Sequence, residues 1–379
     1  MSKIKLFAIL AFTAAQSILT GCGPNQAQID PRNVSDLKIR PSSGRMLFCP
    51  GAPFTVEFVA KLKDGSTCSN LNADSGCMNQ KNTVIDPTVL RLTGSNGRVQ
   101  GQGWVTDDDP LKTADSGIRL KGWMEQVLNG QTYKSMESDI DLKPVYECMS
   151  SADFSQGNGR DDGSNGSPGP AITVAITTLS TPFYPDAALV RVESGTMRQY
   201  YISPSADKPI RITATGQPGA RGRQGAAGNG GQAGTAGAEC KNGTDGANGS
   251  AGGAGGRGGD GGAGGTIRVI LDEANVDKLK GRLLIANPGG AAGEGGFGGP
   301  GGHGGNGGSA GSKPANAPAD CNPQAGRSGQ DGAAGAVGPR GKDGAAGPAP
   351  SFENGKRQAI WANEMQAIQR VEGAGGRAK

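Results

Sequence analysis

The side chains that most often carry out chemistry are scarce in this chain of 379 residues. There is a single histidine, His303, and it lies within a glycine-rich stretch. Ser-His-Asp and Cys-His catalysis need a histidine beside the nucleophile, and most catalytic metal sites use histidine ligands. The composition therefore argues against histidine-based catalysis and against a metal centre.

Two groups of aspartates are the remaining candidates for catalysis. Asp107, Asp108 and Asp109 are consecutive, and Asp139 and Asp141 are two residues apart. Paired carboxylates can act as general acid and general base. Acidic loops are more often solvated turns, and the sequence indicates no substrate pocket beside either group. We predict that the protein is not an enzyme and that it uses no cofactor.

A third polar group lies in a segment of Ser, Asn, Asp, Gly and Pro that precedes residue 171. Asp161, Asp162 and Asn165 are residue types that bind calcium, but their spacing differs from the twelve-residue loop of EF-hand proteins. The composition is typical of a solvated connection. We therefore predict a linker at residues 150–170 and no metal-binding residues.

The N-terminus has the layout of an export signal, with two lysines and then an apolar run over residues 6–12 that is too short to span a bilayer. The motif Leu19-Thr20-Gly21-Cys22 resembles the lipobox of bacterial lipoproteins, which implies lipidation of Cys22. Gly23 follows where aspartate would favour retention in the inner membrane. The resemblance implies a lipid-anchored protein of the cell outer membrane, exposed at the surface. An ordinary secretory signal with a chance cysteine is the alternative.

Six further cysteines follow Cys22. An even number in an exported protein predicts disulfides, and the absence of a Cys-X-X-Cys motif and of nearby histidines argues against zinc. Cys68 and Cys77 flank a short polar loop, and Cys49 and Cys148 flank the first predicted folded region. The predicted disulfides are Cys49–Cys148, Cys68–Cys77 and Cys240–Cys321.

The pattern of a β domain covers residues 36–149. Residues 54–63 alternate between apolar and mostly polar side chains, which is the period of a half-buried strand. Asn96-Gly97 and Asn129-Gly130 each separate two strand-like segments and are strong hairpin signals. The order of strands and turns is loosely similar to bacterial immunoglobulin-like domains. We expect a β-sandwich-like domain of about seven strands here, and a small β unit at residues 171–215.

Most of the 68 glycines lie in residues 216–349, where glycine recurs at every third position. Four runs of 22 residues each have this period: run one at 216–237, run two at 243–264, run three at 290–311 and run four at 326–347. A polyproline II helix has three residues per turn, so each run would align its glycines along one edge. Another backbone can approach such an edge closely because it has no Cβ atoms.

Three arrangements of these runs compete. A collagen triple helix of three chains would be rich in proline at the positions between glycines, but prolines are few and Gly-Gly-X triplets are common. A bundle of antiparallel polyproline II rods within one chain, joined by backbone hydrogen bonds, accounts for the equal run lengths. Full disorder is the third possibility, and the even spacing argues against it. We favour the bundle, and hence a monomer over a homotrimer.

The connectors support the bundle. Cys240 falls between runs one and two and Cys321 between runs three and four, so a bond between them would staple two hairpins at one end. Residues 266–287 alternate in hydrophobicity and predict an inserted hairpin between runs two and three. Those two runs have the most Gly-Gly-X triplets, which frees two edges of each rod and predicts that they are the inner ones.

The glycine tract resembles the polyproline II bundles of snow-flea antifreeze protein and of phage tail-fibre adhesin tips, most closely at residues 301–308. It also resembles bacterial collagen-like proteins, most closely at residues 338–348. After it, Trp361, Met365 and Ile368 share one face of a predicted C-terminal helix. The predicted fold is mainly β, with a β-sandwich-like N-terminal region, a small β unit, a glycine-rich polyproline II helical bundle and a short C-terminal helix. The predicted segments are a signal peptide at 1–21, an anchor linker at 22–35, β domains at 36–149 and 171–215, the bundle at 216–349 and the helix at 356–372.

These features together predict a non-enzymatic, surface-anchored lipoprotein whose rigid projection serves adhesion or another surface interaction. The expected partners are the membrane, through the N-terminal lipid, and an unidentified surface or protein. Acidic and basic residues are interspersed within a net charge of +4, so no nucleic acid is expected. The alternative is a purely structural cell-envelope protein that forms a homotrimer through collagen-like triple helices. Ice binding is disfavoured by charged residues such as Arg221 and Asp260 between the glycines.

Overall fold

The computed structural model describes residues 24–155 and 162–376. The signal-like segment and Cys22 lie outside the described residues. The chain divides into two compact units. The first is Met1–Met46, Pro53–Trp104 and Arg119–Asp141, and the second is Leu47–Ala52, Val105–Ile118 and Leu142–Lys379. The disulfide Cys49–Cys148 joins two segments of the second unit to each other.

Strands make up most of the first unit. They are β1 (Asn25–Ala27), β2 (Val34–Pro41), β4 (Pro53–Leu62), β5 (Thr67–Ser69), β6 (Thr83–Ile85), β7 (Leu90–Gly94), β8 (Gly97–Gln100), β9 (Gly103–Thr106), β10 (Ile118–Leu128), β11 (Gln131–Lys134) and β12 (Ser138–Pro144). The last residues of β9 and β12 and the first residue of β10 belong to the second unit. One sheet has the order β2-β4-β9-β8, with β5 also on β4, and another places β10 between β11 and β12, with β7 also on β10. β1 lies within the predicted anchor linker at residues 22–35 and pairs in parallel with β6.

The alternation predicted for residues 54–63 is confirmed in β4, where Val56, Phe58, Ala60 and Leu62 are buried. The two larger sheets of this unit face each other. Gly122 on β10 lies so close to Phe58 and to Ile39 of β2 that a Cβ atom there would be under 3.0 Å from both side chains. Burial of one face of each sheet accounts for the period-two pattern of the sequence.

The hairpin signal at Asn129-Gly130 is confirmed. Leu128 of β10 pairs with Gln131 of β11, and the two turn residues have φ angles of 52° and 77°. Positive φ at both central positions is the geometry of a type I′ turn, which asparagine and glycine tolerate. The second signal also marks a turn, with Asn96 at a φ of 52°, but β7 and β8 on either side belong to different sheets.

The second unit contains two further sheets. Its strands are β3 (Leu47–Phe48), β13 (Ser151–Asp153), β14 (Ile172–Leu179), β15 (Ala187–Ser194), β16 (Met197–Ser203), β17 (Ile210–Thr213), β18 (Ile267–Asp272), β19 (Leu283–Ala286) and β20 (Ser351–Gly355). The larger sheet has the order β16-β15-β14-β18-β20, and the smaller has the order β13-β17-β19. β3 pairs with the end of β12.

The larger sheet is covered on both faces, so side chains of β14 are buried on both of its sides. On one face Val174 and Ile176 pack with Ile212 of the smaller sheet and Val269 of β18. On the other face, a second cluster contains side chains of the C-terminal segment, among them Trp361, Ile368 and Val371. The sheet therefore holds two cores.

The C-terminal helix predicted at residues 356–372 is present as two pieces, α2 (Arg357–Ile360) and α3 (Met365–Gly375). α1 (Val276–Lys280) is the other α-helix of the described residues. Single 3-10 turns are η1 (Pro31–Asn33), η2 (Ala73–Ser75), η3 (Cys77–Asn79), η4 (Pro87–Val89), η5 (Pro110–Lys112), η6 (Glu147–Met149) and η7 (Glu273–Asn275). No helix among the described residues is long and apolar enough to cross a membrane.

The hairpin predicted at residues 266–287 is wrong. β18 pairs in parallel with β14 and β20, whereas β19 pairs in parallel with β17 in the other sheet. α1 connects β18 to β19. The alternation of apolar residues marked two real strands, but their partners come from distant parts of the chain, which periodicity alone does not reveal.

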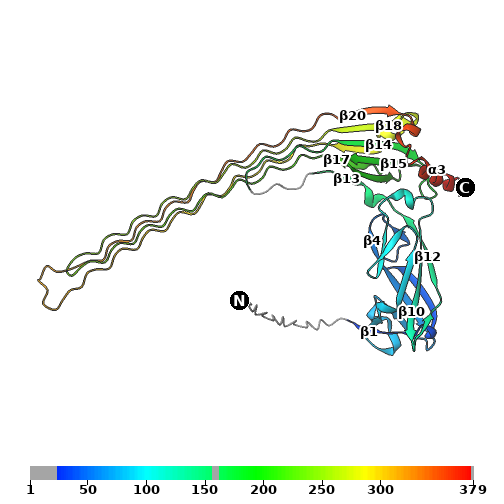
Figure 1. Cartoon of the computed structure of the whole chain (residues 1–379), viewed down its shortest axis with the longest axis horizontal. Helices are drawn as coiled ribbons and strands as arrows, with labels where there is room; N and C mark the ends of the chain where they lie inside the picture. Colours follow the sequence, from blue (N-terminus) through cyan, green and yellow to red (C-terminus); the bar gives the residue numbers. More distant parts are fainter. Residues whose placement is uncertain (1–23, 156–161, 377–379) are drawn as a thin grey trace, which may run out of the picture. The chain divides into compact units, whose positions relative to one another are not determined.

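The four glycine runs lie side by side and carry no helix or strand assignment (Figure 1). Each run continues a strand of the second unit. Run one follows β17 and run three follows β19, while run two leads into β18 and run four leads into β20. Because β17 is parallel to β19 and β18 to β20, the sheets set the direction of every run.

Candidate functional site

The runs are joined by backbone hydrogen bonds that repeat at every third residue. Runs one and two are antiparallel, as in the bond from Gly253 N–H to the Ala226 carbonyl of 2.7 Å. Runs one and three are parallel, with Gly225 N–H donating to the Phe297 carbonyl at 2.8 Å. The next triplet repeats each bond three residues along both runs, in opposite directions for the antiparallel pair and in the same direction for the parallel pair. The glycine tract is thus a hydrogen-bonded assembly within one chain, which we call the four-run bundle.

Runs two and three occupy the inner positions of the four-run bundle, as the Gly-Gly-X pattern predicts. Run two bonds to run four, as in Gly252 N–H to the Ala333 carbonyl, and accepts from run three, as in Gly299 N–H to the Gly253 carbonyl. Run four also donates to run three. Each inner run therefore bonds to all three others, and each outer run bonds to two.

Glycine is required at these contacts because the neighbouring backbone fills the space of a side chain. A Cβ atom at Gly252 would overlap the carbonyl oxygen of Gly299, and one at Gly299 would overlap that of Ala226. Both separations would be well under 3.0 Å, which real Cβ atoms essentially never show. The additional glycine of the Gly-Gly-X triplets gives run three a second edge. A Cβ atom at Gly298 would overlap the carbonyl oxygen of Gly335 in run four.

Asparagine and aspartate side chains supplement the backbone bonds between runs two and four. The Oδ1 atoms of Asn242, Asp245 and Asn248 accept hydrogen bonds of 2.7 to 2.8 Å from the N–H groups of three residues spaced by three, the first just before run four and the others within it: Gln324, Arg327 and Gln330. Asp260 repeats the contact, and its bond from the Lys342 N–H lowers the pKa of its carboxyl. Sequence reasoning missed these contacts, although the period-three spacing of Asn and Asp was a signal for them.

A fifth stretch of chain joins the four-run bundle. Residues 162–170, which we call segment five, lie within the predicted linker. Gly166 N–H donates to the Asp260 carbonyl of run two at 2.8 Å, and Ala220 N–H of run one donates to the Ser164 carbonyl at 2.9 Å. β13 occupies another part of the same predicted linker. The glycines at 163, 166 and 169 have the period of the runs, which was the available signal.

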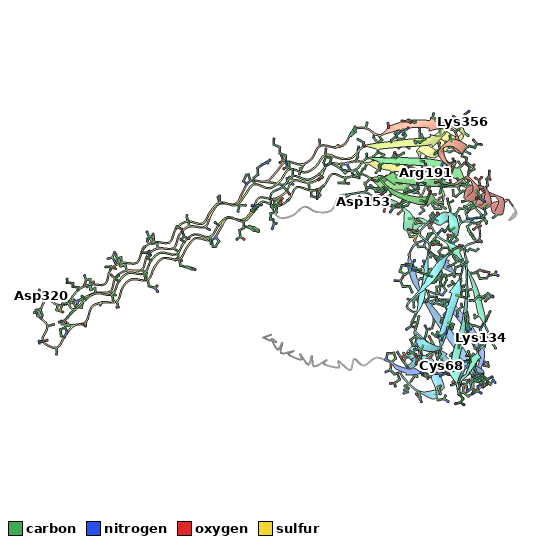
Figure 2. The ribbon with its side chains drawn as sticks, viewed as in Figure 1. Cys68, Lys134, Asp153, Arg191, Asp320 and Lys356 are labelled. Carbon is green, nitrogen blue, oxygen red and sulfur yellow. A yellow bond between two sulfur atoms is a disulfide. The ribbon has the colours of Figure 1, made fainter. Side chains whose placement is uncertain are left out.

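The far end of the bundle is closed by Cys240–Cys321, one of three disulfides in the structure. The other two are Cys49–Cys148 and Cys68–Cys77, so the pairs are the same three that the sequence predicts. Asp320, beside Cys321, lies at the end of the runs away from the sheets (Figure 2). Disulfides indicate that the protein resides in a compartment outside the cytoplasm.

His303 lies on run three and is solvent-exposed, with its Nδ1 atom 3.5 Å from Asp331 of run four. The Asp331 carboxylate also accepts from the Gly304 N–H at 2.8 Å, and this bond lowers the pKa of that carboxyl. The pair joins runs three and four.

The aspartates considered for catalysis are tied to structural contacts. Asp141 accepts two hydrogen bonds from Arg119, at 2.7 and 2.9 Å, which lower the pKa of its carboxyl. Asp139 lies 3.9 Å from Lys121. Both ion pairs are exposed and join neighbouring strands. Asp161 lies outside the described residues, and Asp162 accepts from the Ser164 N–H at 2.9 Å.

Asp107 and Asp109 lie beside the turn η5. Asp107 is 3.4 Å from Lys112, and Asp109 accepts from the Leu111 N–H at 3.0 Å as the N-cap. Asp108 and Asp109 also line an open pocket together with Arg198. Arg198 forms an ion pair with Glu193 at 2.7 Å. Among the described residues, no group of three or more His, Cys, Asp or Glu side chains is placed to hold a metal ion.

Burial of Asp109 raises the pKa of its carboxyl above the ordinary value. Below the unfolded-state pKa of about 4 the group is protonated in both states, and as pH rises from there the unfolded state loses the proton first. The carboxyl therefore lowers stability progressively, up to its folded-state pKa. We expect Asp109→Asn, which keeps the cap, to raise the free energy of unfolding at pH 7 by up to about 1 kcal/mol and to have no effect near pH 3. Urea unfolding at both pH values tests this; equal effects at the two pH values would contradict it.

The C-terminal segment is held to the larger sheet by a buried cluster. Glu364 accepts from Arg191 at 2.9 Å and from the Tyr200 hydroxyl at 2.7 Å, and Arg191 also lies 4.9 Å from the centre of the Trp361 ring. Burial and the bond to Glu364 raise the pKa of Tyr200 to about 12. Arg191 is visible on the sheet in Figure 2. The cluster ties the C-terminal segment to β15 and β16.

Loss of Trp361 should destabilise this core strongly. The side chain is fully buried, so Trp361→Ala is expected to lower the free energy of unfolding by about 3–5 kcal/mol. Phe352 on the edge strand β20 is 52% exposed and provides the control, with an expected effect of Phe352→Ala below about 1 kcal/mol. Chemical denaturation, followed by the circular dichroism of the backbone, measures the free energy of unfolding of both variants. This signal does not depend on the tryptophan that is removed. Equal losses in the two variants would show that Trp361 does not anchor the core.

No model of a known protein family matches the chain, and searches of curated proteins and of solved structures find no significant match.

Proposed function

We propose that the protein is a non-enzymatic lipoprotein of the cell outer membrane that carries a stiff glycine-rich projection for adhesion or another surface interaction. The observation that carries the proposal is the four-run bundle, whose bonds repeat at every third residue over the length of each run. Such a bundle has no core of large side chains and offers a long surface instead. The motif Leu19-Thr20-Gly21-Cys22 supports the lipid anchor, and the disulfides support an exported protein.

We further propose that each run is a polyproline II helix. Hydrogen bonds at intervals of three residues support this, because a helix with three residues per turn presents the same edge at that interval. At about 3.1 Å per residue, a run of 22 residues would be about 70 Å long. The backbone bonds use the glycine edges within one chain, which favours a monomer over a collagen-like trimer.

Shortening the bundle tests the adhesive function without removing strands. Deleting residues 216–349 would remove β18 and β19, so we suggest removing three triplets from each run. The deletions are 228–236, 243–251, 302–310 and 326–334, which shorten the projection by about 28 Å and keep the disulfide at its end. All four runs lose nine residues, so the remaining triplets can pair in register.

We expect the shortened protein to reach the cell surface in normal amount and to lose most of its attachment to the target cell or matrix. Surface display is measured with an antibody against the first unit, and attachment is counted under flow. The control keeps all four runs at full length and carries Ala254→Ser at an exposed position. Normal display with unchanged attachment would contradict the proposed function.

A further inference from the structure

Runs three and four share an exposed apolar patch near the middle of the four-run bundle. Phe297 of run three, the one Phe, Trp or Tyr residue within positions 216–349, is 59% exposed, and Val337 of run four is 65% exposed. Pro300 and Ala334, one triplet farther along their runs, are exposed as well. We call these four residues the apolar patch. Contiguous apolar side chains at a protein surface mark a place of contact with other molecules.

Two exposed ion pairs fix the register of run three against run four. Arg340 Nε lies 3.2 Å from Glu294 on the side of the sheets, and His303 Nδ1 lies 3.5 Å from Asp331 on the side of the far end. Between the first pair and the second, run three advances by nine residues and run four goes back by nine. The two pairs therefore belong to one antiparallel register.

The same register places the apolar patch between the two ion pairs. Because contacts in the bundle repeat at every third residue, residues a whole number of triplets from an ion pair share its face. Phe297 is one triplet from Glu294, and Val337 is one triplet from Arg340. The other two members of the patch are one triplet from the second ion pair. Arg221 of run one reaches this face too, with its guanidinium 5.1 Å from the centre of the Phe297 ring.

A second copy of this face fits it when the two bundles are antiparallel. A two-fold axis through the centre of the apolar patch, at right angles to the runs, lays run four of one copy over run four of the other, and run three over run three. Arg340 of each copy then faces Asp331 of the other, and Glu294 faces His303, each twice by symmetry. Phe297 faces the apolar residues of the other copy. The face is therefore complementary to itself in charge and in hydrophobicity.

Parallel bundles lack this match. In that arrangement run four of one copy lies over run one of the other, with no shift along the runs. Arg340 and Arg221 are at the same level, because Arg340 pairs with the Glu294 side chain while Gly222, next to Arg221, donates to the Glu294 carbonyl. Two pairs of cations would face each other, which disfavours the parallel contact.

We propose that the apolar patch binds a second copy of this chain, with the two bundles antiparallel. Each bundle keeps its own backbone hydrogen bonds, so the contact joins two folded projections. It differs in this from a collagen-like trimer, in which three chains share one helix. The proposal goes beyond the adhesive function, because the contact forms whether or not the bundle attaches to a target.

Sedimentation velocity of the purified full chain, from micromolar to millimolar concentration, tests the association. We expect the mass to rise from that of one chain to that of two. Phe297→Ala should weaken the dimer by about tenfold or more, since a large apolar side chain at the centre of a contact contributes much of its affinity. Phe352→Ala, which removes an exposed phenylalanine from β20, is the matched control and should dimerise normally.

Charge reversal tests the antiparallel register. Arg340→Asp alone brings carboxylates together at both ends of the contact, and Asp331→Arg alone brings guanidinium groups together. Each variant should therefore dimerise about tenfold more weakly or worse. A mixture of the two variants should regain dimers, because every such contact in the mixed pair joins a cation to an anion. Recovery on mixing also shows that both variants are folded.

A mass of one chain at millimolar concentration would overturn the proposal, and so would equal dimerisation of Phe297→Ala and Phe352→Ala. Charge variants that dimerise normally by themselves, or that stay weak when mixed, would overturn the antiparallel contact. A mass of three chains would overturn the two-fold contact. Because the readout is the mass in solution, a failure of attachment to a target surface has no bearing on this result.

Discussion

A single methyl group at the centre of the bundle is expected to disrupt it. Gly252→Ala places a Cβ atom against the carbonyls of Gly299 and Pro300 in run three, where the spacing is set by backbone on both sides. Run three can accommodate the methyl only by moving away. Its bonds to run two would then lengthen over several triplets.

We expect Gly252→Ala to lower the free energy of unfolding by about 3 kcal/mol or more, from overpacking and the loss of several hydrogen bonds. The matched control is Ala254→Val, which adds two methyl groups at an exposed position of the same triplet and should cost less than about 0.5 kcal/mol. Thermal and urea unfolding followed by circular dichroism compares the two. A smaller loss for Gly252→Ala than for the control would contradict the packing described here.

The disulfide at the end of the bundle is the second large contribution. Cys240 and Cys321 are 81 residues apart, and in the chain-entropy account a loop of that length stabilises the folded state by about 4–5 kcal/mol. Replacing both cysteines with serine should therefore destabilise the bundle by about that amount. The far end should open first, because the sheets still hold the near end.

Hydrogen exchange separates these two regions. In the Cys240→Ser, Cys321→Ser variant, the Gly237 and Gly308 N–H groups near the disulfide should exchange much faster, and those of Gly219 and Gly293 near the sheets should change little. The comparison with Cys68→Ser, Cys77→Ser, whose bond closes a separation of 9 residues in the first unit, controls for general destabilisation. Uniform acceleration along the bundle would contradict a local role for this bond.

The arrangement of the runs was largely predictable from the sequence, because the positions of glycine and cysteine reflect local packing and bonding. A glycine at every third position marks an edge, and Gly-Gly-X marks a run with two edges in use. That rule correctly placed runs two and three inside. Cysteines in two connectors of the same end indicated which connectors meet.

Pairings between distant segments were not predictable in the same way. β18 and β19 read as adjacent strands, but their partners β14 and β17 begin 95 and 73 residues earlier, so no turn signal joined them. Segment five was read as a linker, since its serine, asparagine and proline are typical of loops. Its glycines have the same period as those of the runs. Three repeats within nine residues are too few to outweigh the loop-like composition.

Hydrogen exchange of the ¹⁵N-labelled full chain at run two tests the four-run bundle most directly. Gly252 and Gly253 both donate backbone hydrogen bonds, to runs four and one respectively, whereas the Ala254 N–H donates none within the described residues. We predict slow exchange at the two glycines and fast exchange at Ala254, repeated in the next triplet at Gly255, Gly256 and Arg257. A collagen-like trimer would protect one N–H in each triplet, and a disordered tract would protect none; either pattern would contradict the bundle.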